Sequence, residues 1–130
     1  MKTTLGQVVD AHMALLQLQS EKTKFDTSTC LALVRLKKAL LPEAEAFAET
    51  QRQLIEEYAE READGRLSEP EPGRFKISPD KGQEYLRELQ RLRNADTDIR
   101  YEPFRLAASD MRLDMATAEA LDGFIEFTEG

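Results

Sequence analysis

The chain has 130 residues, of which 41% are hydrophobic and 33% are charged, and its formal net charge is −7. This length suits a single domain with a modest core, and the composition is typical of a soluble, helix-rich protein rather than a disordered one. An acidic chain is a poor candidate for binding nucleic acid or an anionic membrane surface, because both carry negative charge themselves.

The cysteine content and the N-terminal segment narrow the class of protein further. Cys30 is the only cysteine, so a secreted scaffold held together by internal disulfides is excluded. Residues 1–13 lack the basic segment followed by an apolar run that marks a signal peptide. We find no apolar stretch near the roughly 20 residues that span a bilayer. We therefore expect a cytoplasmic protein.

The first predicted helix runs from Leu5 to Gln19. Thr4 and Gln7 have the spacing of a capping box, in which each side chain accepts a hydrogen bond from the other residue's backbone. Residues 20–24 are polar and indicate a turn. The apolar residues of the helix recur at helical spacing and predict a broad buried stripe, formed by Leu5, Val8, Val9, Met13, Leu15, Leu16 and Leu18.

The second helical region begins at Asp26 or Thr27, extends to about Ala63 and contains Pro42. Proline in a helix interior costs about 3 kcal/mol, and "PEAE" is also a good first turn, so two separate helices remain an alternative. The apolar stripe nevertheless keeps its phase across the proline, which favours one bent helix. Its members are Leu33, Leu36, Leu40, Ala44, Phe47, Gln51, Leu54 and Tyr58.

The next segment predicts a loop, a strand and a helix. Residues 65–75 contain two glycines and two prolines and indicate a surface loop. Residues 74–77 are a short strand candidate, and Ser78 with Pro79 marks the start of a helix. The apolar stripe of that helix consists of Tyr85, Leu86, Leu89 and Leu92.

Two further elements complete the chain. Residues 98–106 alternate between polar and apolar side chains, with an interruption at Pro103 that is typical of an edge strand. Pairing of this strand with residues 74–77 predicts a small β-α-β unit. Residues 114–127 predict a short last helix, capped by Asp114 and anchored by Met115, Leu121, Phe124 and Ile125.

These elements predict an α+β fold that is mostly α, with residues 1–130 forming a single domain. An antiparallel helical hairpin with a long, kinked second helix occupies residues 1–64. A loop follows at residues 65–75, and residues 74–130 form a small α+β part that packs on the hairpin.

Charge is distributed unevenly along the chain. Residues 22–40 carry five basic side chains against one acidic, a net charge of +4, whereas residues 41–64 carry a net charge of −6. Residues 107–130 carry a net charge of −5. Antiparallel pairing of two such second helices would place basic against acidic halves, so we expect the protein to form a homo-oligomer.

The residues that usually carry catalysis are sparse. His12, the only histidine, lies beside the apolar stripe of the first helix, and Cys30 lies in the apolar stretch "TCLALV". A Cys30–His12 nucleophile pair is possible across the hairpin, but a buried cysteine is usually inert. We predict a protein that is not an enzyme and that binds no cofactor and no metal.

One acidic pair resembles part of a known metal site. Glu56 and Glu60 lie one helical turn apart, as in the first half of the acidic motif of the all-α nucleotide pyrophosphohydrolases, whose helical carboxylates hold magnesium. That resemblance implies a second acidic pair, which Glu119 and Asp122 can supply only from far downstream. A solvated acidic helix face is the simpler interpretation.

The order of the elements resembles a family of small bacteriophage and prophage proteins of unknown function, encoded near tail and lysis genes in phages of Gram-positive hosts. The segments that carry the resemblance are "LGQVVDAHMALLQL", "FDTSTCLALVRLKKAL", "GRFKISPDKGQEYLRELQRL", "DIRYEPFRL" and "MATAEALDGFIEF". The resemblance implies a phage accessory protein made in the host cytoplasm. Its anchor positions are Leu36, Phe47, Leu54, Ile55, Tyr58, Leu89, Leu121 and Phe124.

Three functions remain open at this stage. The first is a non-enzymatic accessory protein that acts through protein–protein contacts with phage or host proteins, in virion or tail morphogenesis. The second is an acidic inhibitor of a host defence or nucleic-acid enzyme, and the third is a magnesium-dependent nucleotide pyrophosphohydrolase. The predicted partner-binding residues for the inhibitor are Glu56, Glu57, Glu60, Glu62 and Asp64.

Overall fold

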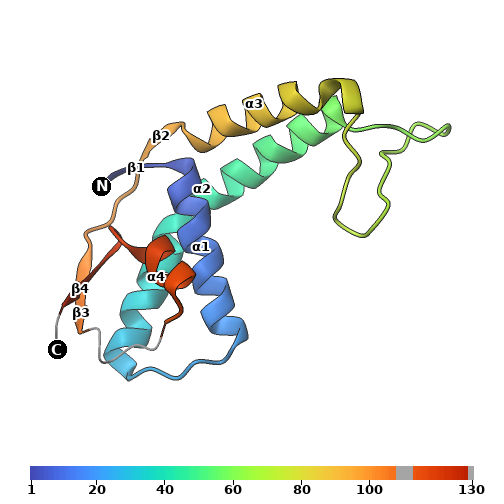
Figure 1. The fold of residues 1–130 in the computed structure, drawn as a ribbon. Helices are drawn as coiled ribbons and strands as arrows, with labels where there is room; N and C mark the ends of the chain where they lie inside the picture. The colour runs from blue at the N-terminus through green and yellow to red at the C-terminus, as the bar shows by residue number, and fades with distance from the viewer. Residues whose placement is uncertain (108–112, 129–130) are drawn as a thin grey trace.

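The computed structural model describes residues 1–107 and 113–128 and shows an α+β fold that is mostly helical (Figure 1). Part of the acidic C-terminal segment, residues 108–112 and 129–130, therefore lies outside the described residues. An N-terminal helix pair, a long second helix, short strands and a short C-terminal helix confirm the predicted fold class. The elements in chain order are β1 (Lys2–Thr4), α1 (Leu5–Ser20), α2 (Thr27–Tyr58), η1 (Pro79–Lys81), α3 (Gly82–Arg93), β2 (Asp96–Asp98), β3 (Phe104–Ala107), α4 (Met115–Leu121) and β4 (Ile125–Thr128).

Helices α1 and α2 begin where the sequence predicted, because their first residues form local caps. Thr4 Oγ1 accepts from the backbone N–H of Gln7, and Gln7 Oε1 accepts from that of Thr4, both at 3.3 Å. Asp26 Oδ1 accepts from the backbone N–H of Thr29 at 2.7 Å. These bonds satisfy N–H groups that a helix start otherwise leaves unpaired.

Helix α2 continues through Pro42 and does not end there. The proline removes the N–H that would bond the carbonyl of Lys38. Buried Leu40 before the proline and buried Phe47 after it keep the same helical phase. Packing on both sides of Pro42 therefore outweighs the local cost, and Figure 1 shows α2 changing direction near its middle.

The far end of α2 differs from the prediction, because the helix stops at Tyr58 instead of continuing to about Ala63. Ala59 is extended, with φ −75° and ψ 150°, and forms an isolated antiparallel bridge with Ile77. Residues 74–77 therefore return alongside the end of α2, and the strand predicted there is reduced to single bridges.

The strand partners were also predicted wrongly. Strand β2 pairs antiparallel with β1, and β3 pairs parallel with β4. The predicted helix over residues 114–127 ends at Leu121, because Asp122 is extended and Gly123 has a φ of +89°. The β-α-β unit is therefore β3-α4-β4, which begins where the predicted unit was expected to end.

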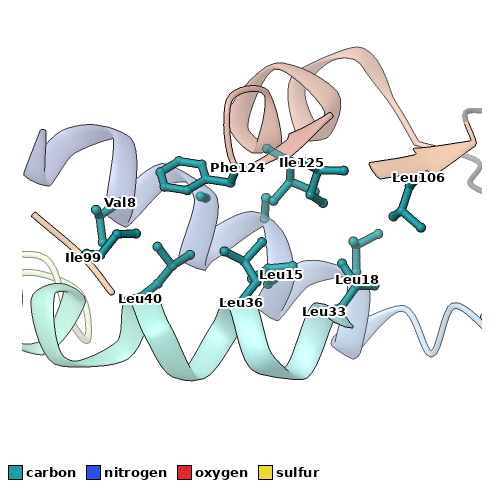
Figure 2. Close-up of a cluster of buried hydrophobic side chains, with 13 residues drawn as sticks. Val8, Leu15, Leu18, Leu33, Leu36, Leu40, Ile99, Leu106, Phe124 and Ile125 are labelled. Carbon is teal, nitrogen blue, oxygen red and sulfur yellow. The ribbon is translucent and has the colours of Figure 1, made fainter. Parts of the chain in front are cut away.

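The main core lies between the hairpin and the C-terminal elements (Figure 2). Leucines of α1 and α2 point toward Leu106, Phe124 and Ile125. The buried residues of this cluster are Val8, Ala11, Ala14, Leu15, Leu18, Leu33, Leu36, Leu40, Ile99, Leu106, Leu121, Phe124 and Ile125. Four apolar residues that the sequence assigned to buried stripes are exposed instead, namely Met13, Leu16, Leu86 and Met115.

The second half of α2 projects away from this core and has α3 beside it (Figure 1). We call residues 43–93 the arm. The arm holds its two helices together through the buried Phe47 and Tyr58 of α2, and the rings of Tyr58 and Tyr85 meet edge to face at 6.1 Å. Arg93, at the end of α3, ties the inner end of the arm to α1 through an ion pair with Asp10 at 2.8 Å.

The length and polarity of the helices determine whether any of them could span a membrane. Helix α2 has 32 residues, which is long enough for a bilayer, but charged side chains occur along its length. Across residues 1–107 and 113–128, every helix is either too short or too polar to span a membrane.

Candidate interaction surfaces

The five acidic residues chosen from the sequence lie in one continuous stretch at the outer end of the arm. Glu56 and Glu57 belong to the last turn of α2, and Glu60, Glu62 and Asp64 follow in the loop. Four of these side chains are exposed, and Glu60 is half-buried. The stretch is therefore accessible to a partner.

Basic side chains from later in the chain pair with two of these acids and reduce the local negative charge. Arg66 Nε lies 2.6 Å from Asp64 Oδ2, and Lys76 Nζ lies 3.3 Å from Glu60 Oε2. Exposed pairs of this kind contribute at most about 1 kcal/mol to stability. Their effect on recognition is larger, because they interrupt the row of charge that an imitation of a phosphate backbone requires. The net charge of residues 41–64 does not include Arg66 and Lys76, because both bases follow that segment in the chain.

The acids at the end of α2 are not explained by helix stability. Glu56 and Glu57 sit at the negative end of the helix dipole, where a carboxylate is unfavourable. Arg61 offsets this by donating from Nη2 to the backbone carbonyl of Glu56 at 3.2 Å. Burial, with Glu57 next in importance, raises the pKa of Tyr58 above its usual value. Solubility or binding is thus the remaining role for the pair.

The carboxylates of the magnesium hypothesis are not brought together. Glu56 and Glu60 lie at the outer end of the arm, whereas Glu119 and Asp122 belong to α4 and its end, beside α1 (Figure 1). Within residues 1–107 and 113–128, groups of three or more His, Cys, Asp or Glu side chains suited to a metal ion are absent. The proposed four-carboxylate site is therefore wrong.

His12 and Cys30 are also apart. Burial lowers the pKa of His12, with Lys37 acting in the same direction and Glu45 against it, so the imidazole lies opposite the middle of α2. Its Nε2 is buried and has no hydrogen-bond partner among the described residues. Cys30 lies in the first turn of α2, about 10 Å along the axis from Lys37, and is exposed rather than buried. The sequence interpretation of a buried cysteine is thus corrected.

A groove that the sequence analysis missed lies between α1 and α2 near their connecting turn. Its volume is about 510 Å³, and most of its exposed lining is apolar. Lys37 and Lys38 stand among these apolar side chains, and Lys37 Nζ donates to Gln19 Oε1 across the helices at 2.7 Å. We call this the basic groove. Its lining residues are Leu15, Leu18, Gln19, Thr23, Phe25, Cys30, Leu33, Val34, Lys37, Lys38 and Leu41.

A second candidate surface, of opposite charge, combines exposed methionines of α1 and α4 with acidic side chains. Met115 is 78% exposed, although the sequence predicted it as a core anchor. Glu119 lies one turn further along the same face, and Asp122 follows α4. Met13 of α1, 63% exposed, lines the shallow hollow of about 460 Å³ between α1 and α4. We call Met13, Met115, Glu119 and Asp122 the acidic methionine patch.

Comparison with known proteins adds no relative. No family model, no curated protein and no solved structure matches the chain. The likeness to small phage proteins therefore stays a prediction from the sequence.

Proposed function

We propose that this protein is a non-enzymatic, phage-encoded accessory protein that acts in the host cytoplasm through protein–protein contacts, in virion or tail morphogenesis. The observation that carries the proposal is the pair of exposed apolar surfaces with opposite charge, the basic groove and the acidic methionine patch. A contiguous exposed apolar surface such as the groove marks an interaction site more often than single exposed residues do.

The arm supports the same proposal. Its two helices extend from the core and bury little apolar surface. They form a long, narrow element with many exposed charges. Such an element is poorly suited to enclosing a small substrate, because ligand sites are concave and mostly apolar. It is well suited to lying against another protein.

The proposal is tested by affinity purification of the tagged protein from phage-infected cells, followed by mass spectrometry. The expected result is recovery of virion or tail proteins by the native chain. Two variants, Val34→Glu in the basic groove and Met115→Glu in the acidic methionine patch, should lose this recovery, while Leu86→Glu on the arm should keep it. Equal recovery by all variants would contradict the role of these surfaces, and recovery of no phage protein would contradict morphogenesis.

The second candidate is an acidic inhibitor of a host defence or nucleic-acid enzyme, favoured by the exposure of Glu56, Glu57 and Glu62. Arg66 and Lys76, paired with neighbouring acids, weaken this candidate. Replacement of Glu56, Glu57 and Glu62 by lysine should abolish binding to such an enzyme in the same purification. Binding of a host nuclease that survives this reversal would remove the idea of phosphate imitation.

A further inference from the structure

The two exposed apolar surfaces complement one another in charge and chemistry. The basic groove is a mostly apolar channel between two helices with Lys37 and Lys38 among its lining residues. The acidic methionine patch presents Met115 and Glu119 on one face of a helix, with Asp122 beyond its end. A helix that lays apolar and charged side chains into a groove of opposite charge is a common mode of protein recognition.

We propose that α4 of one copy docks in the basic groove of a second copy, so that the chain associates head to tail. This inference rests on the proposed function, in that it names a second copy as one of the protein partners. Met115 enters the aliphatic part of the groove beside Val34 and Leu41, while Glu119 and Asp122 face Lys37 and Lys38.

Methionine suits position 115 both when the side chain is exposed in the monomer and when it is docked in the groove. Its unbranched, polarizable side chain adapts to an irregular apolar groove, and methionine is common at surfaces that bind other proteins. The rest of α4 is firmly held, since Leu121 is fully buried and Asp114 Oδ1 caps the helix by accepting from the N–H of Thr117 at 2.7 Å. The backbone of α4 is therefore held in place before docking, which lowers the entropic cost of association.

The charges that meet are not neutralised by opposite charges in the described part of the monomer, although Lys37 also donates a hydrogen bond to Gln19. Among the ion pairs of residues 1–107 and 113–128, the side chains of Lys37, Lys38, Glu119 and Asp122 take no part. Lys22 and Lys24, on either side of the groove-lining Thr23, extend the positive potential at the groove's end. Pairing of groove with groove would bring lysines together, so a symmetric contact through this surface is disfavoured.

Groove and patch are distinct surfaces, and this decides the form of the assembly. The groove is lined by α1, the turn after it and α2, whereas the patch is formed by α4 and the exposed side of Met13. When one surface of a molecule binds a different surface of the next, each copy keeps both surfaces in use. Such heterologous contacts produce rings if the rotation closes and filaments if it does not.

This proposal replaces the antiparallel pairing of second helices expected from the charge layout. The acidic half of α2 buries Phe47 and Tyr58 within the arm. It therefore has few apolar side chains left to place in a second copy's groove. The opposite charge and the exposed apolar residue occur together on α4 instead.

The test is sedimentation velocity of the full chain and its variants, alone and mixed, over micromolar to millimolar concentration at low salt. Val34→Glu blocks the groove and Met115→Glu blocks the patch, and each should weaken self-association at least about tenfold. Mixed together, they should form a 1:1 heterodimer and nothing larger, because one intact groove meets one intact patch. Leu86→Glu, at a position 62% exposed on the arm, is the control and should assemble like the native chain.

A charge exchange provides the second measurement. K37E/K38E and E119K/D122K should each fail to assemble alone, whereas their mixture restores full assembly because every groove again meets a patch of opposite charge. High salt should weaken the native association, since exposed charges are screened beyond about 8–10 Å. All variants should keep the native circular dichroism spectrum and unfolding midpoint.

Three results would overturn the inference. The first is a native chain that stays monomeric at every concentration. The second is a mixture of the two blocked variants that stays monomeric, and the third is a blocked variant that assembles as the native chain does. A fluorophore on Cys30, which lines the groove, tests a small-molecule occupant with dodecanoate as the probe. Dodecanoate binding by a strictly monomeric chain would assign the groove to an anionic amphiphile instead. Recovery of phage proteins by a monomeric chain would leave the proposed function standing while this inference fails.

Discussion

The two halves of α2 belong to one helix but lie in very different surroundings. Before Pro42, Leu33, Leu36 and Leu40 contribute to a core that α1, α4 and the strands share. After Pro42, Phe47 and Tyr58 are buried in the arm, outside that cluster. The difference shows that a stripe of constant phase predicts which residues are buried, but not how many elements bury them.

This contrast has a consequence for stability. Residues of the first half are held by several neighbours that are distant in sequence, so their loss affects the whole fold. Residues of the arm depend mainly on one partner helix, and regions with few buried apolar contacts open with lower free energies. We therefore expect the arm to open before the core unfolds.

The largest expected effect comes from the core half. Leu36 is 0% exposed, and Leu36→Ala removes its buried side chain and leaves a cavity. This change should lower the free energy of unfolding by about 2–5 kcal/mol. Denaturant unfolding followed by circular dichroism measures it, and Val34→Ala, at a half-exposed position of the same helix, should change it far less. Equal losses in the two variants would mean that the first half of α2 is not the centre of the core.

The joint between the halves gives the next effect. Pro42→Ala restores an N–H to the helix and should raise the free energy of unfolding by up to about 3 kcal/mol. Pro79→Ala is the matched control, because Pro79 begins η1, where proline is favourable. The control should lose about 0.4–1 kcal/mol through the greater freedom of the unfolded chain. If Pro42→Ala is destabilising, the bend itself is needed for packing on both sides.

A change in the arm sharpens the comparison. Tyr58→Ala removes the buried ring that meets Tyr85, so the arm should open more often. Hydrogen exchange should accelerate at least about tenfold in residues 43–58 and 82–93, with little change around Leu36. Leu86→Ala, on the exposed side of α3, should leave exchange unaltered. Acceleration throughout the chain would show that arm and core unfold as one unit.

Local signals explain which elements were predictable. The starts of α1, α2 and α4 depend on caps at Thr4, Asp26 and Asp114, each of which bonds an N–H three residues away. The strand partners were predicted wrongly because the sequence of a strand of three or four residues does not indicate which strand it pairs with. We predicted that residues 74–77 pair with the strand over residues 98–106, whereas β2 pairs with the N-terminal strand β1.

The candidate surfaces show the same division. The acidic stretch at the arm's end was visible from composition, but the bases that neutralise it come from residues beyond it in the chain. The basic groove does leave a signal in the sequence, since its lining residues Cys30, Val34, Lys37 and Leu41 step by three or four along a second face of α2. The exposure of Met115 had none, because α4 buries its opposite face and sequence spacing cannot say which face meets α1.

The smallest effect is the pH dependence of stability, which depends on His12 of α1 opposite the middle of α2. The pKa of His12 is lowered below 6.5, mainly by burial and then by Lys37 of the first half, while Glu45 of the second half acts oppositely. The unfolded chain therefore takes up a proton first as the pH falls, and the free energy of unfolding should decline as pH decreases below about 6.5. His12→Gln should show a smaller decline between pH 7 and pH 5. Denaturant unfolding of both proteins at matched pH isolates the histidine, because carboxylates contribute equally to the two curves. Parallel curves would mean that water reaches the His12 imidazole, so that α1 packs less closely against the middle of α2 than the buried imidazole indicates.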